Sequence, residues 1–314
     1  MEKIDSRKAM DFLKSHDRFL LVGHVRPDGD DVGSMVALHN VLLSMGKKAD
    51  MVLGDPVPSH FRFLDAAPLV MTAIPEDASY DALVFTDLSN IERGGNFDFP
   101  KADSLCIDHH VSNTGYTDYL YLQPDYAATA EMLAEMFFDE GLTLSEDTCN
   151  ALYMGMATDS GFFRFECTKA RTLALASRLV GAGAKPAYIS NHLDTVSQTS
   201  MQVYRMVLDT LHYEGEGKIA LAVMDEKAMA LDGENADYYV SIPRKVEGVE
   251  IGILFKCDKP DVTRVSFRSR RYADVAELAS RFGGGGHVRA AGCTIPKPLH
   301  EAEADVIREA LQVI

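Results

Sequence analysis

The stretch Gly23-His24-Val25-Arg26-Pro27-Asp28-Gly29-Asp30-Asp31-Val32-Gly33-Ser34 separates an apolar run from an amphipathic one. Residues 19–22 before it are all apolar, and residues 32–45 have helical periodicity. A buried strand is therefore expected to end here and a helix to begin. Pro27 and Gly29 are typical of the turn between them.

The turn concentrates side chains that bind metals. Open α/β sheets place their ligands outside the carboxyl ends of strands, so His24, Asp28 and Asp30 are expected to converge there. Two carboxylates and an imidazole suit Mn²⁺ or Mg²⁺, with Zn²⁺ as an alternative. A second interpretation also fits: Asp30 or Asp31 could only cap the helix, with no metal involved.

The composition limits the classes of partner. The chain has 314 residues, enough for about two domains. It contains 31 basic and 47 acidic residues, so its formal net charge is −16 at pH 7. Long duplex DNA is not an expected partner, because general attraction to phosphates needs basic patches. Small anions remain candidates, since metals and a few arginines can supply local positive charge.

Cysteine usage and the chain start predict a cytoplasmic location. The cysteines are scattered and form no Cys-x-x-Cys pair, which is typical of reduced thiols. Residues 1–5 lack the apolar core of a secretion signal. No run approaches the roughly 18 apolar residues of a membrane span, so no membrane partner is expected. The five cysteines are Cys106, Cys149, Cys167, Cys257 and Cys293.

Apolar runs alternate with helical periodicity up to about residue 185. This alternation predicts an α/β fold with an N-terminal doubly wound, mostly parallel sheet. The chain is expected to divide into a first domain over residues 1–186, a linker over 187–205 and a smaller α/β domain over 206–314.

The two periodicities also place the single elements. The predicted strands cover residues 19–22, 49–53, 82–87, 104–110, 119–122, 218–224, 249–256, 262–269 and 292–295. The predicted helices cover residues 5–17, 32–45, 128–140, 145–158, 169–182, 201–211, 226–231, 235–245, 273–282 and 299–313.

Acids and imidazoles recur where other predicted elements end. Asp87 and Asp108-His109-His110 each end a strand, and Asp159 ends a helix. Each could be structural when taken singly, but the carboxyl ends of parallel strands meet at one sheet edge. Carboxylates gathered there without cations would repel and raise one another's pKa. Two divalent cations would remove that repulsion and stabilise a phosphoryl transition state.

These motifs resemble a known family. The turn Gly23-His24-x-x-Pro27-Asp28-Gly29-Asp30, the lone Asp87, the triplet Asp108-His109-His110 and Asp159 are similar to the four motifs of the DHH phosphoesterase superfamily. That superfamily includes RecJ exonucleases, manganese-dependent pyrophosphatases and cyclic-dinucleotide phosphodiesterases. The resemblance implies a DHH catalytic domain in the N-terminal part.

The C-terminal part carries a second resemblance. Residues 281–292, Arg-Phe-Gly-Gly-Gly-Gly-His-Val-Arg-Ala-Ala-Gly, look like the DHH-associated substrate domain. With Val265-Ser266-Phe267-Arg268-Ser269, the chain is most similar to the bacterial nanoRNase, or oligoribonuclease, group. Members of that group also dephosphorylate 3′-phosphoadenosine 5′-phosphate.

The resemblance implies two Mn²⁺ ions, with Mg²⁺ as the alternative, and Asp87 shared between them. One ion would be held by His24, Asp28 and Asp87, and the other by Asp30, Asp87, His109 and Asp159. The catalytic candidates are Asp108, which would orient an imidazole, and His110, which would donate to the scissile phosphate. Asp31 departs from the family pattern, which usually has a small residue there.

The glycine run is a candidate anion site. Successive glycines let backbone N–H groups approach an anion closely, and Arg268 offers a fork that fits phosphate. The alternative is a flexible glycine hinge or turn. The candidate substrate-binding residues are Ser266, Arg268, Ser269, Gly284, Gly285, Gly286, His287 and Arg289.

The predicted function is a Mn²⁺-dependent phosphodiesterase and phosphatase that degrades short single-stranded RNA from the 3′ end, and dinucleotides, and hydrolyses 3′-phosphoadenosine 5′-phosphate. One alternative is a phosphodiesterase for cyclic or linear dinucleotides, since only the substrate domain distinguishes the two enzymes. A non-enzymatic alternative is a nucleotide-binding regulator. A homodimer is compatible with the sequence, which leaves the oligomeric state open.

Overall fold

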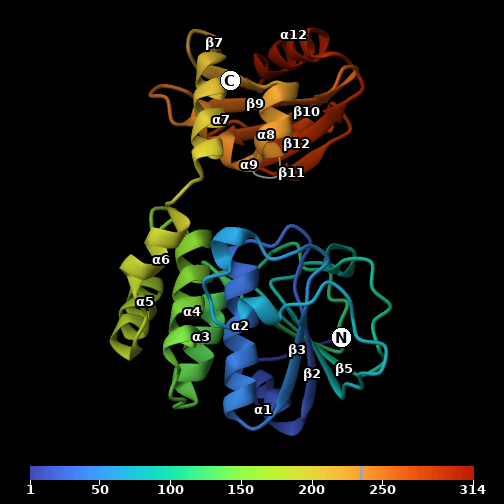
Figure 1. The fold of residues 1–314 in the computed structure, drawn as a ribbon, viewed down its shortest axis with the longest axis vertical. Helices are drawn as coiled ribbons and strands as arrows, with labels where there is room; N and C mark the ends of the chain where they lie inside the picture. The colour runs from blue at the N-terminus through green and yellow to red at the C-terminus, as the bar shows by residue number, and fades with distance from the viewer. Residues whose placement is uncertain (234–235) are drawn as a thin grey trace. The chain divides into compact units, whose positions relative to one another are not determined.

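The computed structural model describes residues 1–233 and 236–314, without the side chains of Asp237, Asp258 and His287. It divides into two compact units, Met1–Thr195 and Val196–Ile314 (Figure 1). None of the described helices is both long enough and apolar enough to cross a lipid bilayer.

The first unit is built on a six-stranded sheet in which all neighbouring strands run parallel, as predicted. The order across the sheet is β1-β6-β5-β4-β2-β3. The strands are β1 (Glu2–Lys3), β2 (Arg18–Val22), β3 (Lys48–Val52), β4 (Ala82–Thr86), β5 (Asp103–Asp108) and β6 (Tyr119–Leu122). The short β1 was not predicted, because two exposed residues show no hydrophobic periodicity.

The strand sequences are continuous apolar runs because both faces of the sheet are buried. In β2, Phe19 and Leu21 pack into the core under the helices. Leu20 and Val22 point to the other face, where a second cluster forms under loops. Short 3₁₀ turns interrupt these loops at η1 (Ser59–Phe61), η2 (Ala67–Leu69) and η3 (Ile91–Gly94).

The helices of the first unit lie close to the predicted ranges, apart from one that was not predicted. They are α1 (Ser6–Ser15), α2 (Gly29–Ser44), α3 (Thr129–Asp139), α4 (Glu146–Asp159), α5 (Ala170–Ala182) and α6 (Pro186–Leu193). The unpredicted helix is α6, which begins with proline at its first position. Most of the stretch expected to link the domains is therefore helical.

Two glycines let α2 and α4 approach closely. A Cβ atom on Gly33 would lie 2.4 Å from the carbonyl oxygen of Ala151, and one on Gly155 would lie 2.9 Å from Oδ1 of Asp30. No side chain larger than hydrogen fits at either position. This contact brings the C-terminal end of α4 beside the N-terminal end of α2 (Figure 1).

The second unit contains a six-stranded sheet in the order β11-β12-β10-β9-β8-β7. Strands β8 and β9 are parallel, and the other neighbouring pairs are antiparallel. The strands are β7 (His212–Glu214), β8 (Ile219–Met224), β9 (Ile251–Lys259), β10 (Val262–Ser269), β11 (Gly285–His287) and β12 (Ala290–Ile295).

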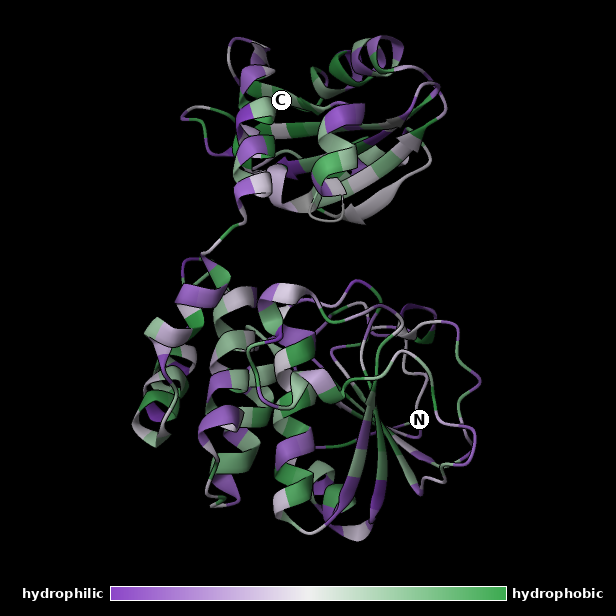
Figure 2. Ribbon diagram, viewed as in Figure 1, coloured by the Kyte–Doolittle hydropathy of each residue, from purple (hydrophilic) through white to green (hydrophobic). Residues whose placement is uncertain are grey.

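Helices cover both faces of this second sheet. Two separate cores result, one including residues of α11 and α12 and the other including residues of α7, α8, α9 and α10. In α12, Ala302, Val306 and Ala310 are buried, whereas its other sides are largely hydrophilic (Figure 2). The helices are α7 (Gln198–Asp209), α8 (Glu226–Asp232), α9 (Ala236–Tyr239), α10 (Ser241–Arg244), α11 (Val275–Ser280) and α12 (Leu299–Ala310).

Candidate metal centre

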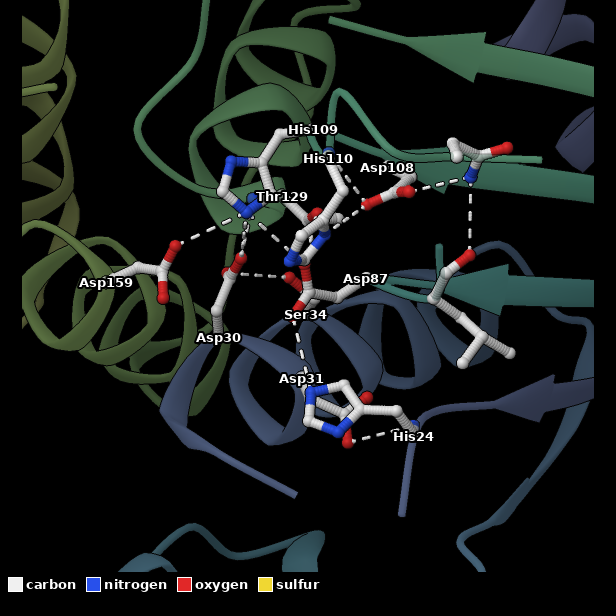
Figure 3. A network of polar contacts seen from close by, with 12 residues as sticks. His24, Asp30, Asp31, Ser34, Asp87, Asp108, His109, His110, Thr129 and Asp159 are labelled. Atoms are coloured by element: carbon white, nitrogen blue, oxygen red, sulfur yellow. Dashed lines mark hydrogen bonds and ion pairs between the residues drawn. The ribbon is translucent and has the colours of Figure 1, made fainter. Parts of the chain in front are cut away.

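The acids and histidines predicted from the strand ends gather at one edge of the first sheet (Figure 3). His24 follows β2, Asp87 follows β4, and Asp108 is the last residue of β5. Asp30 lies in the first turn of α2, and Asp159 is the last residue of α4. Parallel pairing of β2, β4 and β5 brings these distant residues together.

Asp28 caps α2 and also faces His24. Its Oδ1 accepts hydrogen bonds from the backbone N–H groups of Asp30 and Asp31, both at 3.1 Å. Its Oδ2 lies 3.7 Å from Nε2 of His24. The prediction that Asp30 or Asp31 caps the helix is wrong. Asp28 precedes the helix in an extended conformation, and its carboxylate accepts hydrogen bonds from both N–H groups.

Asp87 lies between the two histidines. Its Oδ2 is 3.6 Å from Nε2 of His24, and its Oδ1 is 3.5 Å from Nε2 of His109. The hydroxyl of Thr129 donates to the same Oδ1 at 3.0 Å. Asp87 has a φ of +56°, in the left-handed region that residues with a Cβ rarely adopt. Such strain is typical of functional sites.

His109 offers a lone pair to the cluster. Its Nδ1 lies 3.2 Å from the carbonyl oxygen of Tyr126, a contact that favours the tautomer with N–H at Nδ1 and an acceptor at Nε2. Its buried Nε2 has no hydrogen-bond partner among the described residues. That nitrogen faces carboxylate oxygens of Asp159 at 3.3 Å and Asp30 at 3.9 Å (Figure 3). A nitrogen lone pair that faces carboxylate oxygens in this way is suited to binding a metal cation placed between them.

Asp30 is held by the N-terminal end of α3. Its carboxylate accepts the backbone N–H groups of Thr129 at 2.6 Å and Ala130 at 2.8 Å. The hydroxyl of Ser34 donates to it at 3.2 Å. Thr129 and Ser34 were missed from the sequence. The predicted helix start near residue 128 was the available signal, because the first turn of a helix has free N–H donors.

The electrostatics of the cluster call for added positive charge. Burial and then the charges of Asp87 and Asp159 raise the pKa of Asp30 well above its ordinary value. Burial and Asp87 do the same to the pKa of Asp159. Burial by itself would lower the pKa of His24, but neighbouring carboxylates outweigh it and raise that pKa to about 12. Divalent cations would stabilise all the carboxylates in their charged form.

Three sets of side chains could each hold a metal ion, because the ligand atoms within each set lie within 4.8 Å of one another. Such spacing, with oxygen and imidazole donors, suits first-row divalent metals. Asp87 belongs to two of the sets, and His109 to two. The sets are His24, Asp28 and Asp87; Asp30, His109 and Asp159; and Asp87, His109 and His110.

Asp108 contacts His110. Its Oδ1 lies 2.8 Å from Nδ1 of His110, and its Oδ2 accepts from the side-chain amide of Asn113 at 2.6 Å. Burial opposes charge on His110, but the hydrogen bond to Asp108 and nearby carboxylates raise its pKa to about 9. His110 is therefore protonated at neutral pH and can donate a hydrogen bond to an anion.

Asp31 is fully buried below the turn. Its Oδ2 accepts the backbone N–H of His24 at 3.2 Å, and its Oδ1 has no hydrogen-bond partner among the described residues. A Cβ atom on Gly23 would lie 2.0 Å from that Oδ1, so only glycine fits above it. Burial raises the pKa of Asp31 well above its ordinary value.

The substrate-binding candidates of the second unit lie on or beside the strands β10, β12 and β11, of which β11 is the edge strand of its sheet. Ser266, Arg268 and Ser269 belong to β10, which is next to β12 and one strand away from β11. Arg289 donates to the carbonyl oxygen of Ala273 at 2.8 Å. The predicted His287 belongs to β11, and its side chain lies outside the described residues.

The glycine run is not a flexible hinge throughout, because Gly285 and Gly286 pair with β12 as a strand. The reason is close contact between backbones. A Cβ atom on Gly284 would lie 2.2 Å from the carbonyl oxygen of Gly292, and one on Gly286 would lie 2.5 Å from that of Ala290. Gly286 also has a φ of +147°. These glycines allow the strand to form at a distance that side chains would prevent.

Comparison with known proteins identifies the class. Residues 18–156 match the DHH family, N-terminal domain, and residues 216–314 match the DHHA1 domain. The chain belongs to the DHH family, and the expectation of a phosphoesterase is confirmed.

Two of the relatives are bifunctional oligoribonucleases and PAP phosphatases, NrnA. The protein from Thermus thermophilus is 30% identical over 92% of this chain and 88% of its own length. The protein from Bacillus subtilis is 25% identical over 90% of this chain and 91% of its own length. The similarity therefore extends over both units.

Solved structures agree on the fold. An exopolyphosphatase-related protein from Bacteroides fragilis superposes with a TM-score of 0.88 at 20% identity, covering 98% of this chain and 95% of the other. RecJ from Thermus thermophilus, solved with Mn²⁺, gives a TM-score of 0.53 at 12% identity, covering 98% of this chain and 54% of the other. At these identities the likeness shows the fold alone.

Proposed function

We propose that this protein is a Mn²⁺-dependent phosphodiesterase and phosphatase that degrades short RNA oligonucleotides and hydrolyses 3′-phosphoadenosine 5′-phosphate. The observation that carries the proposal is the position of Asp87, with one carboxylate oxygen 3.6 Å from Nε2 of His24 and the other 3.5 Å from Nε2 of His109. A carboxylate between two imidazoles is suited to bridging two cations. The substrates are those in the names of the NrnA relatives.

The buried cluster would hold two Mn²⁺ ions. We assign His24, Asp28 and Asp87 to one ion, and Asp30, Asp87, His109 and Asp159 to the other. When bound, such a pair lowers the pKa of water and neutralises charge on a transferring phosphoryl group. The protein keeps the ligands in place through the hydrogen bonds from Thr129, Ala130 and Ser34.

His110 would stabilise the phosphate during hydrolysis. Asp108 accepts a hydrogen bond from Nδ1 of His110, and this contact raises the pKa of the imidazole and favours its protonated form. Nε2–H is then available to donate to a phosphate oxygen. Asn113 fixes the Asp108 carboxylate at 2.6 Å, which restricts the rotation of the imidazole.

The second unit would bind the nucleotide part of the substrate. We assign this role to Ser266, Arg268, Ser269 and Arg289 together with the edge formed by Gly284, Gly285, Gly286 and His287. Guanidinium groups bind phosphate through two parallel hydrogen bonds, and strand edges present free N–H groups. The net charge of −16 disfavours long nucleic acids and favours short ones.

A cytoplasmic location completes the proposal. Cys106, Cys149 and Cys293 are buried and form no disulfide with any described residue. Buried thiols without disulfides are typical of a reducing compartment.

A substrate panel tests the function. The purified protein with Mn²⁺ is given diribonucleotides, 3′-phosphoadenosine 5′-phosphate, a long RNA, cyclic di-AMP and pyrophosphate. We expect the diribonucleotides and the bisphosphate to be hydrolysed fastest, with the long RNA largely spared. Preferential cleavage of the cyclic dinucleotide would instead support the signalling alternative. Binding without turnover would support a nucleotide-binding regulator.

Two variants separate the roles of the units. Asp87→Ala should abolish turnover of every substrate, because it removes the carboxylate shared by both ions. Arg268→Ala should raise KM about tenfold or more and leave kcat within about twofold, because we assign Arg268 to substrate binding and not to the metal centre. Arg308→Ala, at an exposed position on α12, is the matched control and should change neither constant. An equal fall in kcat for Asp87→Ala and Arg268→Ala would contradict the division of roles.

A further inference from the structure

The turn that follows α4 holds bulky residues in a left-handed backbone. Phe162 and Phe163 have φ values of +57° and +61°, directly after Gly161 at +59°. Among the described residues, three other non-glycine residues have positive φ: Arg26, Asp87 and Glu216. Arg26 and Asp87 lie in loops of the metal centre, and Phe162 lies three residues after Asp159. Left-handed backbone therefore concentrates around this centre.

Hydrogen bonds hold the strained turn in one conformation. The backbone N–H of Phe162 donates to the carbonyl oxygen of Ala157 at 2.5 Å, and that of Phe163 donates to Oγ of Ser160 at 3.0 Å. The Arg164 guanidinium donates to the carbonyl oxygen of Gly161 at 2.6 Å. The turn is thus tied to the last turn of α4, whose final residue is Asp159.

Core packing explains the position of Phe163 and leaves Phe162 unexplained. The ring of Phe163 contacts Tyr153 edge-on, with the ring centroids 5.6 Å apart, and joins the main core. The side chain of Phe162 is 37% exposed, and that of Phe165 is 47% exposed. The Phe165 ring lies over Gly161, where a Cβ atom would be 2.4 Å from it. Two exposed aromatic rings therefore lie three and six residues after Asp159, the residue of α4 that belongs to the metal centre.

We propose that Phe162 and Phe165 form a stacking platform for a nucleobase of the substrate. The inference rests on the proposed function, because it requires a nucleotide whose phosphate lies at the metal centre. Every nucleobase has an aromatic face, and stacking on protein aromatic rings binds bases with little sequence preference. In a nucleotide, a single ribose separates the base from the phosphate. A platform for the base only three to six residues after Asp159 suits this short separation. The strain at Phe162 then has a functional cause.

Phe162→Ala and Phe165→Ala in the full chain with Mn²⁺ test the platform. The substrates are a diadenosine dinucleotide and the corresponding dinucleotide with abasic ribose in place of both nucleosides. We expect each variant to raise KM for the adenine substrate about tenfold, a loss of about 1.4 kcal/mol, with kcat within about twofold. KM for the abasic substrate should stay at the wild-type value. Equal changes for both substrates, or none for either, would overturn the inference.

Two controls address a purely structural role. Phe162→Tyr keeps an aromatic ring and should retain the wild-type KM. Leu173→Ala removes an exposed apolar side chain on α5 and should leave KM unchanged. Phe162→Gly relieves the left-handed strain, so it should raise the melting temperature while raising KM for the adenine substrate. A more stable Phe162→Gly variant with unchanged KM would refute the platform.

A binding measurement separates failure of the platform from failure of the proposed function. A dinucleotide containing 2-aminopurine loses fluorescence when its base stacks on an aromatic ring. If the wild-type protein quenches this probe but cleaves no dinucleotide, the proposed function fails and the platform is supported, provided that Phe162→Ala abolishes the quenching. If the protein cleaves dinucleotides and Phe162→Ala quenches as the wild type does, the platform fails alone.

Discussion

Replacing Thr129 by valine should weaken metal binding and leave the fold intact. The Thr129 hydroxyl donates to Oδ1 of Asp87 at 3.0 Å, and both residues are buried. Valine has nearly the same shape as threonine and lacks the donor. The backbone N–H of Thr129 would continue to hold Asp30 at 2.6 Å. The substitution therefore removes one contact to the carboxylate that we assign to both ions.

The size of the effect follows from the chemistry of that contact. A hydrogen bond to a buried charged group contributes about 2 kcal/mol, which corresponds to roughly a 30-fold change in an equilibrium constant. Partners that orient metal ligands typically change metal affinity or activity by about 10- to 100-fold. We therefore expect the dissociation constant for Mn²⁺ to rise about 30-fold and activity to recover partly at high Mn²⁺.

Calorimetric titration of metal-stripped protein with Mn²⁺ measures this change, and thermal unfolding without metal checks the fold. Thr148→Val is the matched control, because Thr148 is also buried and its hydroxyl bonds Ser145 at 2.8 Å at the start of α4, with no other partner among the described residues. It should leave Mn²⁺ affinity unchanged. Wild-type affinity in Thr129→Val, or an equal loss in Thr148→Val, would refute the reasoning.

Two further substitutions test the packing and the electrostatics. Gly155→Ala should lower both the melting temperature and Mn²⁺ affinity, because the new Cβ would lie 2.6 Å from Cβ of Ala130 and 2.9 Å from Oδ1 of Asp30. Overpacking costs about 1–3 kcal/mol, more than the about 0.5–1 kcal/mol that alanine gains in a helix, so an unchanged melting temperature would contradict the contact. Burial opposes charge on Glu250, but three backbone N–H groups of residues 271–273 donate to its Oε1 and lower its pKa below 4.5. Its carboxylate therefore stabilises the fold above pH 4.5 and ceases to do so as the pH falls through the lowered pKa. Glu250→Gln should lose about 2 kcal/mol of unfolding free energy at neutral pH and show less loss on acidification, measured by urea unfolding. A parallel pH dependence in wild type and variant would contradict this account.

Much of the fold and of the centre could be predicted because the relevant signals are local. Apolar residues 19–22 followed by the periodic run 32–45 indicate a strand and a helix, which the structure contains as β2 and α2. Acids at strand ends were expected at one edge because parallel strands share a direction. Asp87 and the triplet at 108–110 do meet there.

Contacts between segments far apart in the chain could not be predicted from such local signals. Thr129 donates hydrogen bonds to Asp30 and Asp87, which are 99 and 42 positions away in the chain. Local hydrophobic periodicity predicts that a helix begins near residue 129, but not which side chains this helix start will contact. The glycine run was expected as an anion site or a flexible turn, whereas contact with β12 makes part of it a strand.

The sequence by itself determined most of the elements, the class of fold and the residue types available for catalysis, because periodicity and strand-end chemistry act over a few neighbouring residues. The tertiary structure decided which carboxylate oxygen faces which imidazole, that Asp28 and not Asp31 caps α2, and that Phe162 is held exposed in a left-handed turn. These outcomes depend on close packing such as that of α2 on α4, where hydrogen bonds and excluded volume join residues that are remote in the chain.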